Sequence, residues 1–313
     1  MQLHKSRRFG EYFQDTFAFL KQNGGHLYKH FFIINGVFLM LLMVFAYFLS
    51  KFYSEVFFGS IVNGNQNALE NYINQNSGLF VALIIAVVII ALVAAIIAYT
   101  FVPIYLKLYI DHDGKSFSAL DVAKSYKHNL SKILIFLLCS MIVLIPVLIL
   151  AGFVSFILSI TIIGMLLLPL VFGAVSLYYQ GSLMEYLEQK RSIWESFGYF
   201  LHLLSSKFWP SVGSAGIFFV MAYIAQTAVT FIPYIFGVVN LFVDVEPGAI
   251  PKPGEIQQTM TIVLILIFVL SFIVGSLLNV IIQLNQGIIF YSLKENNENI
   301  NTKSEIDLIG TSE

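Results

Sequence analysis

Long apolar runs without a formal charge dominate the chain and alternate with short segments that gather its polar and charged residues. A helix needs about 20 apolar residues to cross a bilayer, and five runs meet that length: 31–50, 78–106, 133–184, 208–243 and 256–293. The third run is 52 residues long, so we expect two spans joined near 151–159, where Gly152, Ser155 and Ser159 interrupt it. The pattern therefore predicts an all-α polytopic membrane protein with six spans, near 31–50, 79–103, 133–151, 161–182, 211–232 and 260–283.

Composition narrows the class of protein further. Of the 313 residues, 58% are apolar and only 11% are Asp, Glu, Lys or Arg, whereas soluble domains carry about 25% charged residues. This excludes a soluble enzyme, and the net charge of −1 leaves no broad basic surface for nucleic acid. The single cysteine, Cys139, excludes disulfides and cysteine metal clusters.

The distribution of basic residues predicts the orientation. With six spans, one side holds the N-terminus, the 104–132 and 183–210 loops and the C-terminal tail, and it carries 15 of the 17 basic residues. Only Lys51 and Lys252 lie on the other side. Because basic loops stay in the cytoplasm, we expect a multi-pass protein of the cell membrane with both termini cytoplasmic and the first span as an uncleaved anchor.

The cytoplasmic segments resemble one another, which indicates an internal threefold repeat. Each begins with a basic residue, continues into an aromatic-rich helix and leads into a span; the openings read Arg7-Arg8-Phe9, Lys115-Ser116-Phe117 and Arg191-Ser192-Ile193-Trp194. Ser118 with Asp121, and Ser192 with Glu195, fit the capping box that starts a helix. We expect a single membrane domain over 1–295, made of interfacial helix and transmembrane hairpin in copies near 7–113, 115–190 and 191–296, and a disordered tail over 296–313.

The short amphipathic helices are the predicted contact with membrane lipid. They are too short to span, yet their apolar faces cannot all face water. The residues assigned to the membrane interface are Arg7, Arg8, Phe9, Phe13, Phe17, Phe117, Arg191, Trp194 and Phe197. In the alternative interpretation these faces pack against the ends of the long spans as a purely structural collar.

The run Ser192-Ile-Trp-Glu-Ser-Phe-Gly-Tyr-Phe-Leu, together with six spans preceded by amphipathic segments, resembles a group of bacterial membrane families. One of them is the membrane domain attached to some glycerophosphodiester phosphodiesterases. The catalytic domain of that family is a TIM barrel with His-Arg and Glu-x-Asp motifs, for which the chain has neither room nor residues. The resemblance therefore implies the membrane module alone.

Candidate chemistry is sparse. No predicted span holds Asp, Glu, His, Lys or Arg, so the acid–base groups of a membrane hydrolase are lacking, and we expect neither enzyme activity nor a cofactor. Asp111-His112-Asp113-Gly114 has possible metal ligands but is typical of a turn. His26 and His30, at i and i+4, lack a third ligand, so no metal site is predicted.

Amide side chains are the candidate binding residues. Asn279, Gln283 and Gln286 share one face of the last helix, and Gln180 and Gln226 lie in spans four and five. They would line a polar vestibule or serve as interhelical hydrogen bonds. Two hypotheses follow: a non-enzymatic module that scaffolds another membrane or cytoplasmic protein or engages lipid at the cytoplasmic leaflet, and a small transporter or channel component with an amide-lined vestibule.

Overall fold

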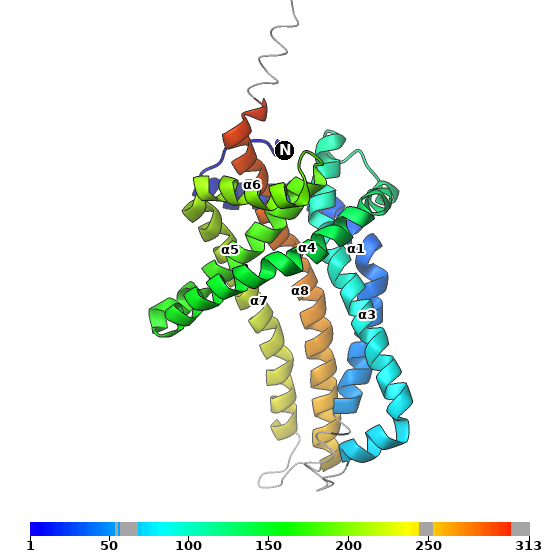
Figure 1. The fold of residues 1–313 in the computed structure, drawn as a ribbon. Helices are drawn as coiled ribbons and strands as arrows, with labels where there is room; N and C mark the ends of the chain where they lie inside the picture. The colour runs from blue at the N-terminus through cyan, green and yellow to red at the C-terminus, as the bar shows by residue number, and fades with distance from the viewer. Residues whose placement is uncertain (54–55, 57–67, 244–252, 302–313) are drawn as a thin grey trace, which may run out of the picture. The chain divides into compact units, whose positions relative to one another are not determined.

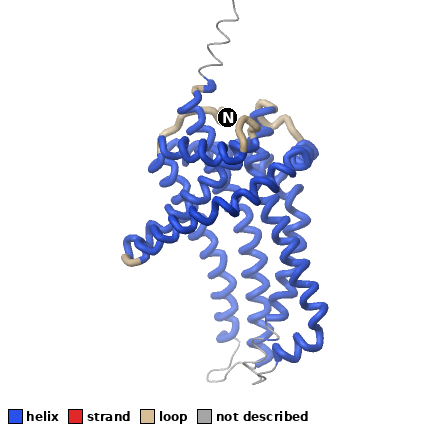
Figure 2. The backbone as a smooth tube through the Cα atoms, viewed as in Figure 1, coloured by secondary structure: helices blue, strands red, loops and turns tan. Residues whose placement is uncertain are grey.

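The computed structural model describes residues 1–53, 56, 68–243 and 253–301. In this part of the chain it contains helices and no strand (Figure 2). The helices are α1 (Phe9–Tyr53), α3 (Ala68–Asp111), α4 (Ala119–Ser159), α5 (Ile162–Leu187), α6 (Ile193–Ser206), α7 (Phe208–Val243) and α8 (Pro253–Glu298), shown in Figure 1.

Six of these helices are long and apolar enough to cross a membrane. Their apolar stretches are Phe9–Ser50, Val81–Asp111, Ala119–Ser159, Ile162–Leu187, Phe208–Val239 and Gly254–Glu298. This confirms the all-α, six-span membrane class. The threefold repeat and the orientation in the membrane stay predictions.

The amphipathic segments differ from the expected separate helices. The segment that begins at Phe9 continues without a break into α1, and the segment that begins at Ala119 continues into α4. Only α6 is a separate helix; the chain breaks at Lys207, with φ −137° and ψ 51°, before α7 starts. Both predicted capping boxes are formed: the Ser118 amide donates to Asp121 at 2.9 Å, and the Ser192 amide donates to Glu195 at 2.9 Å.

The turn between the third and fourth spans was placed wrongly by the sequence. Helix α4 continues through Gly152 and Ser155, and the chain turns at Ile160 and Thr161 instead of over 151–159. A helix in an apolar medium keeps its backbone bonds even where glycine and serine weaken the pattern. Thr161 sets the turn because its side chain accepts the Gly164 amide at 3.0 Å and caps α5.

The chain divides into two compact units, each with its own internal packing. Unit 1 comprises the described residues of Met1–Ile34, Tyr99–Ala222 and Leu278–Glu313, and unit 2 those of Asn35–Ala98 and Tyr223–Leu277. Helices α1, α3, α7 and α8 each contribute one part to unit 1 and another to unit 2. All of α4, α5 and α6 belongs to unit 1.

Small residues set the helix contacts inside unit 1. Helix α5 meets α7 where Gly173 lies against Gly216: a Cβ at Gly173 would lie 2.7 Å from the Gly216 backbone nitrogen. Further along α5, the Phe200 ring of α6 covers Gly181. Such close backbone approach is how transmembrane helices gain packing without a hydrophobic driving force between them.

The segments between spans one and two and between spans five and six lie partly outside the described residues. Helix α1 ends at Tyr53 and α3 begins at Ala68, so both ends of the first segment are helical. Of the second segment, only the helical ends in α7 and α8 are described. Helix α8 reaches Glu298, three residues into the expected tail, and residues 302–313 lie outside the described part of the chain.

Candidate functional site

An ion cluster ties α5 to α8 in unit 1. The side chains of Glu185 and Lys294 have no exposed surface, and Lys294 Nζ lies 2.8 Å from Glu185 Oε2. Lys294 also contacts Glu188, and Arg191 contacts the other oxygen of Glu185. Burial raises the pKa of Glu188, against the opposing charge of Lys294. Buried charges are tolerated only when they are paired and hydrogen-bonded, and this cluster meets that condition.

Further along the same interface lies a row of uncharged polar groups. Gln286 of α8 donates to Ser176 of α5 at 2.8 Å. Gln180 follows Ser176 by one helical turn and is fully buried, and neither its Nε2 nor its Oε1 has a hydrogen-bond partner among the described residues. We call the set Ser176, Gln180, Glu185, Gln286 and Lys294 the α5–α8 seam.

The five predicted amides differ in burial and are divided between the two units. Gln283 and Gln286 are buried in unit 1, whereas Asn279, the first member of the predicted row, is exposed. Gln226 belongs to unit 2, where its Nε2 donates to the Ser271 carbonyl at 3.3 Å. Gln180, Gln283 and Gln286 thus remain as candidates in unit 1, and Gln226 serves as a helix–helix hydrogen bond.

A second polar contact was missed by the sequence. Asn285, fully buried, donates to Ser214 of α7 at 3.1 Å and to Thr16 of α1 at 3.2 Å, so it joins three helices. Its position beside Gln286 was a signal, since polar residues in apolar helices face the bundle interior. Asn285 lies outside the face of α8 that Asn279, Gln283 and Gln286 share.

The first residues of the chain fold against unit 1. We call residues 2–8 the N-terminal strap. Arg7, predicted at the lipid interface, has no exposed side-chain surface. Its guanidinium donates to the carbonyls of Gln2, Leu3 and Lys5 at 2.7–2.9 Å and to Asp15 at 2.6 Å. A buried guanidinium needs its donors satisfied, and the strap's own carbonyls supply the acceptors, so Arg7 cannot face lipid.

The strap also contacts α8 and the residues that follow it. The Arg7 amide donates to Ser292 Oγ at 2.9 Å, and Asn301 donates to the His4 carbonyl. The His4 ring packs edge-on against Tyr291 with centroids 5.0 Å apart, and Leu3 is buried. Burial, followed by the positive charge of Lys294, lowers the pKa of His4 to about 4.

The basic residue that opens each predicted copy makes a contact inside unit 1. Arg7 pairs with Asp15, Arg191 pairs with Glu185, and Lys115 donates to the Gln22 carbonyl at 3.0 Å. These side chains stabilise the unit, and the sequence pattern gave no means of seeing their partners. Arg8, adjacent to Arg7, is exposed.

The predicted aromatic interface residues divide into inward and outward groups. Phe117 is buried beside His26 and Tyr105, and Phe197 is buried on Phe136 with centroids 5.2 Å apart, so neither faces lipid. Phe13 and Phe17 stack on Phe218 of α7, although Phe17 keeps 45% of its surface exposed. Phe9 and Trp194 are exposed, by 42% and 54%. The collar interpretation thus describes the inward group, and the interface interpretation fits only the outward group.

The two metal candidates have other partners. His26 contacts the Tyr105 hydroxyl at 2.8 Å through Nδ1 and the Phe117 carbonyl at 3.3 Å through Nε2. His112 contacts the Leu108 carbonyl of its own helix, and Asp113 and Gly114 have φ of 49° and 127°. These positive φ values are typical of the turn that ends α3.

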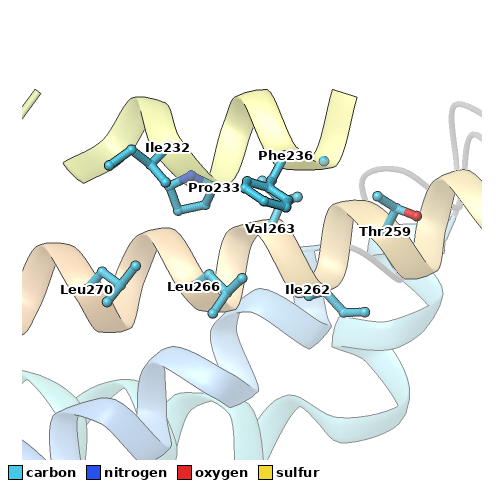
Figure 3. Close-up of a pocket in the computed structure, with 9 residues that line it drawn as sticks. Ile232, Pro233, Phe236, Thr259, Ile262, Val263, Leu266 and Leu270 are labelled. Atoms are coloured by element: carbon cyan, nitrogen blue, oxygen red, sulfur yellow. The ribbon is translucent and has the colours of Figure 1, made fainter. Parts of the chain in front are cut away.

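Unit 2 carries an apolar groove of 260 Å³ between α7 and α8, shown in Figure 3. Ile232, Pro233 and Phe236 line it from α7, and Val263, Leu266 and Leu270 line it from α8. Among the described residues that line it, Thr259 has the only polar side chain. The groove offers apolar contact and no group for acid–base chemistry.

Comparison of the chain with known protein families, with curated proteins and with solved structures returned no match. The candidate sites therefore rest on the contacts described above.

Proposed function

We propose that this integral membrane protein is a non-enzymatic module that engages anionic lipid at the cytoplasmic leaflet through the outward side of α6. The observation that carries the proposal is the uneven burial of the apolar stripe of α6. Phe197, Phe200 and Leu204 are buried, whereas Trp194 and Leu201, along the outer edge of the same stripe, are 54% and 56% exposed. An exposed apolar edge of this kind favours contact with another surface.

The residues around this edge favour a lipid surface. Trp194 has the amphipathic ring that prefers the boundary between headgroups and hydrocarbon. Burial of Trp194 and Leu201 in lipid would contribute roughly 1.5–3 kcal/mol each. Lys190, whose side chain is 58% exposed, lies just before α6, and a cation at an anionic surface adds about 1 kcal/mol. The resemblance to the membrane domain of the phosphodiesterases agrees with a module of this kind and stays a proposal.

Fluorescence quenching tests the proposal in the full chain. Trp209→Phe leaves Trp194 as the single indole, and the protein is reconstituted with brominated phosphatidylglycerol or brominated phosphatidylcholine. We expect Trp194 to be quenched by both lipids and more strongly by the anionic one, because Lys190 enriches anionic headgroups nearby. Lys190→Gln should reduce that difference.

A matched control uses the inner face of the same helix. With both natural tryptophans replaced by Phe, Phe197→Trp should stay unquenched because position 197 is buried on Phe136. Absence of quenching at Trp194 would refute lipid contact, and equal quenching by the two lipids would refute the anionic preference.

One observation favours a second candidate function, a small transporter or channel component. Gln180 is fully buried in unit 1 with both amide atoms unpartnered, and polar groups at membrane depth mark substrate pathways. The test is uptake of small uncharged solutes into proteoliposomes. Gln180→Leu should abolish uptake while the helical content is kept; equal uptake by Gln180→Leu would refute a role for this residue.

A further inference from the structure

We propose that the α5–α8 seam is a binding site for water and small uncharged molecules that both donate and accept hydrogen bonds, closed at one end by the N-terminal strap. This inference rests on the second candidate function and is independent of the lipid contact of α6. It assigns a ligand class to Gln180 and a role to residues 2–8.

The ligand class follows from the chemistry of the seam. The primary amide of Gln180 has two N–H donors and an oxygen acceptor, and in the fully buried side chain both atoms lack a partner among the described residues. An unpaired amide in an apolar interior is unfavourable. A neutral molecule with both a donor and an acceptor satisfies it, and a buried water makes about three such bonds.

The position of Gln180 is fixed by contacts on either side. Ser176, one turn before it on α5, accepts a hydrogen bond from Gln286 at 2.8 Å. Glu185, five residues after it, pairs with Lys294. Gln180 therefore lies at a level between two places where α5 and α8 are in direct polar contact. A molecule bound there has uncharged partners on one side and the ion cluster on the other.

The strap covers the end of the seam that holds the ion cluster. Leu3 is buried, and His4 packs on Tyr291, one turn before Lys294 on α8. Lys107 of α3 donates to the Leu187 carbonyl at the end of α5 at 2.7 Å, and Lys294 of α8 pairs with Glu185 of α5, so the ends of the three helices meet here. The strap lies over the point where the three helices converge.

Arg7 holds the strap closed. It bonds three strap carbonyls and Asp15 of α1, so one side chain both folds the strap and fastens it to a helix. The Arg7 amide adds a bond to Ser292 of α8. Loss of the guanidinium removes all four side-chain contacts at once. Arg8 offers a matched control, since it has the same charge and is exposed.

Radical footprinting of the full chain in nanodiscs tests the site itself. Hydroxyl radicals made by X-ray radiolysis oxidise buried side chains that lie beside bound water. Met184 is the reporter, since it is one turn from Gln180 on α5 and only 3% exposed. We expect Met184 to be oxidised in the parent protein and at least fivefold less in Gln180→Leu. Absence of oxidation in the parent, or equal oxidation in the two proteins, overturns the site.

Thiol labelling tests the strap. In a Cys139→Ser background, Gln180→Cys is treated with a small hydrophilic methanethiosulfonate in inside-out membrane vesicles, which expose the side predicted to be cytoplasmic. We expect slow labelling in this background, a rate at least tenfold higher when Arg7→Ala is added, and no change when Arg8→Ala is added. Fast labelling with the strap intact, or a rise in the Arg8→Ala control, overturns the closing role.

Two variants with smaller structural effects replace Arg7→Ala if that variant does not fold. If Arg7→Ala does not accumulate as a folded protein, Asp15→Ala and Ser292→Ala each remove one fastening contact and should raise the labelling rate severalfold. No rise in either overturns the closing role. Solute uptake is read separately: oxidation of Met184 without any uptake keeps the hydration site and refutes transport, whereas missing oxidation refutes the site whatever the uptake.

Discussion

Units 1 and 2 share four helices but differ in the chemistry of their interiors. Unit 1 buries Arg7, Glu185, Lys294 and the Asn285 contact between α1, α7 and α8. Among the described residues of unit 2, the buried polar side chains are Asn35 and Ser50, neither of which is ionisable. The groove of unit 2 is lined almost entirely by apolar groups.

The difference between the units shows that charged residues near the ends of membrane spans can be buried inside the protein. The basic residues that predict the orientation lie in the segments between the predicted spans. Counting Lys and Arg on each side treats all of them as surface groups. In unit 1 several of them are instead paired inside the protein. A few buried charges therefore hold unit 1 together, whereas unit 2 is held by apolar contacts and isolated amide or hydroxyl bonds.

The largest effect should come from breaking the ion cluster. Glu185→Ala leaves Lys294 with Glu188 alone and removes the buried partner of Arg191. We expect the free energy of unfolding to fall by about 3 kcal/mol, measured by denaturant titration in detergent micelles.

The double variant Glu185→Leu with Lys294→Met sharpens this test, because it removes both fully buried charges, while Glu188 keeps Lys190 at 3.9 Å and Arg191 keeps Glu298 at 3.8 Å. It should lie within about 1 kcal/mol of the parent. If Glu185→Ala unfolds no more easily than the double variant, the ion cluster does not hold unit 1.

A pair of glycines provides the next comparison. Gly173→Ala in unit 1 places a methyl group against the Gly216 backbone, whereas Gly237→Ala in unit 2 meets only the Val263 side chain. Backbone cannot move aside as a side chain can, so we expect Gly173→Ala to cost about 1–3 kcal/mol and Gly237→Ala less. Melting temperatures in detergent measure both, and the reverse order would show that α5 and α7 are free to separate.

Acid should release the strap without affecting unit 2. The pKa of His4 is lowered from 6.5 to about 4 by burial, and then by Lys294, Lys190 and Arg7, with Glu298 opposing. A free strap therefore binds a proton at a higher pH than a docked one, so docking is strongest above pH 6.5 and weakens as the pH falls toward 4.

A spin label at Gln2→Cys, in a Cys139→Ser background, measures this release as increased mobility on acidification. His4→Phe keeps the ring and removes the titrating group, and should abolish most of the pH dependence. A pH response unchanged by His4→Phe would assign it to another group.

The smallest effect is expected in unit 2. Gln226→Leu removes the bond to the Ser271 carbonyl, and such bonds between membrane helices average about 0.6 kcal/mol. A loss several times larger would show that unit 2 also depends on its polar contacts, and the contrast between the units would fail.

The sequence predicted those features that depend on local pattern. Charge-free runs gave the six apolar helices, and the capping boxes at Ser118 and Ser192 gave the starts of α4 and α6. Both features arise from residues near each other in the chain, so a single sequence contains the whole signal.

The sequence pattern could not predict whether an individual polar residue is buried or exposed. Arg7 and Arg8 are adjacent and chemically identical, yet one is buried and the other exposed. The difference is made by carbonyls of a non-helical strap, to which no periodicity applies. Helical spacing also grouped Asn279 with Gln286, because it shows which residues share a face and not which of them has a partner. Gln286 donates to Ser176 of α5, whereas Asn279 is exposed.

The two-residue turn between α4 and α5 bears on biosynthesis. The chain from 133 to 184 contains no charge, and its turn at Ile160 and Thr161 has no polar loop to be carried across a bilayer. Ser159 donates to the Ser155 carbonyl at 2.7 Å and Thr161 caps α5, so both hydroxyls are already satisfied by the backbone. Neither helix therefore needs an orientation signal of its own. The pair can leave the translocon together as a hairpin, with Lys132 and Lys190 on the side that the distribution of basic residues predicts to be cytoplasmic.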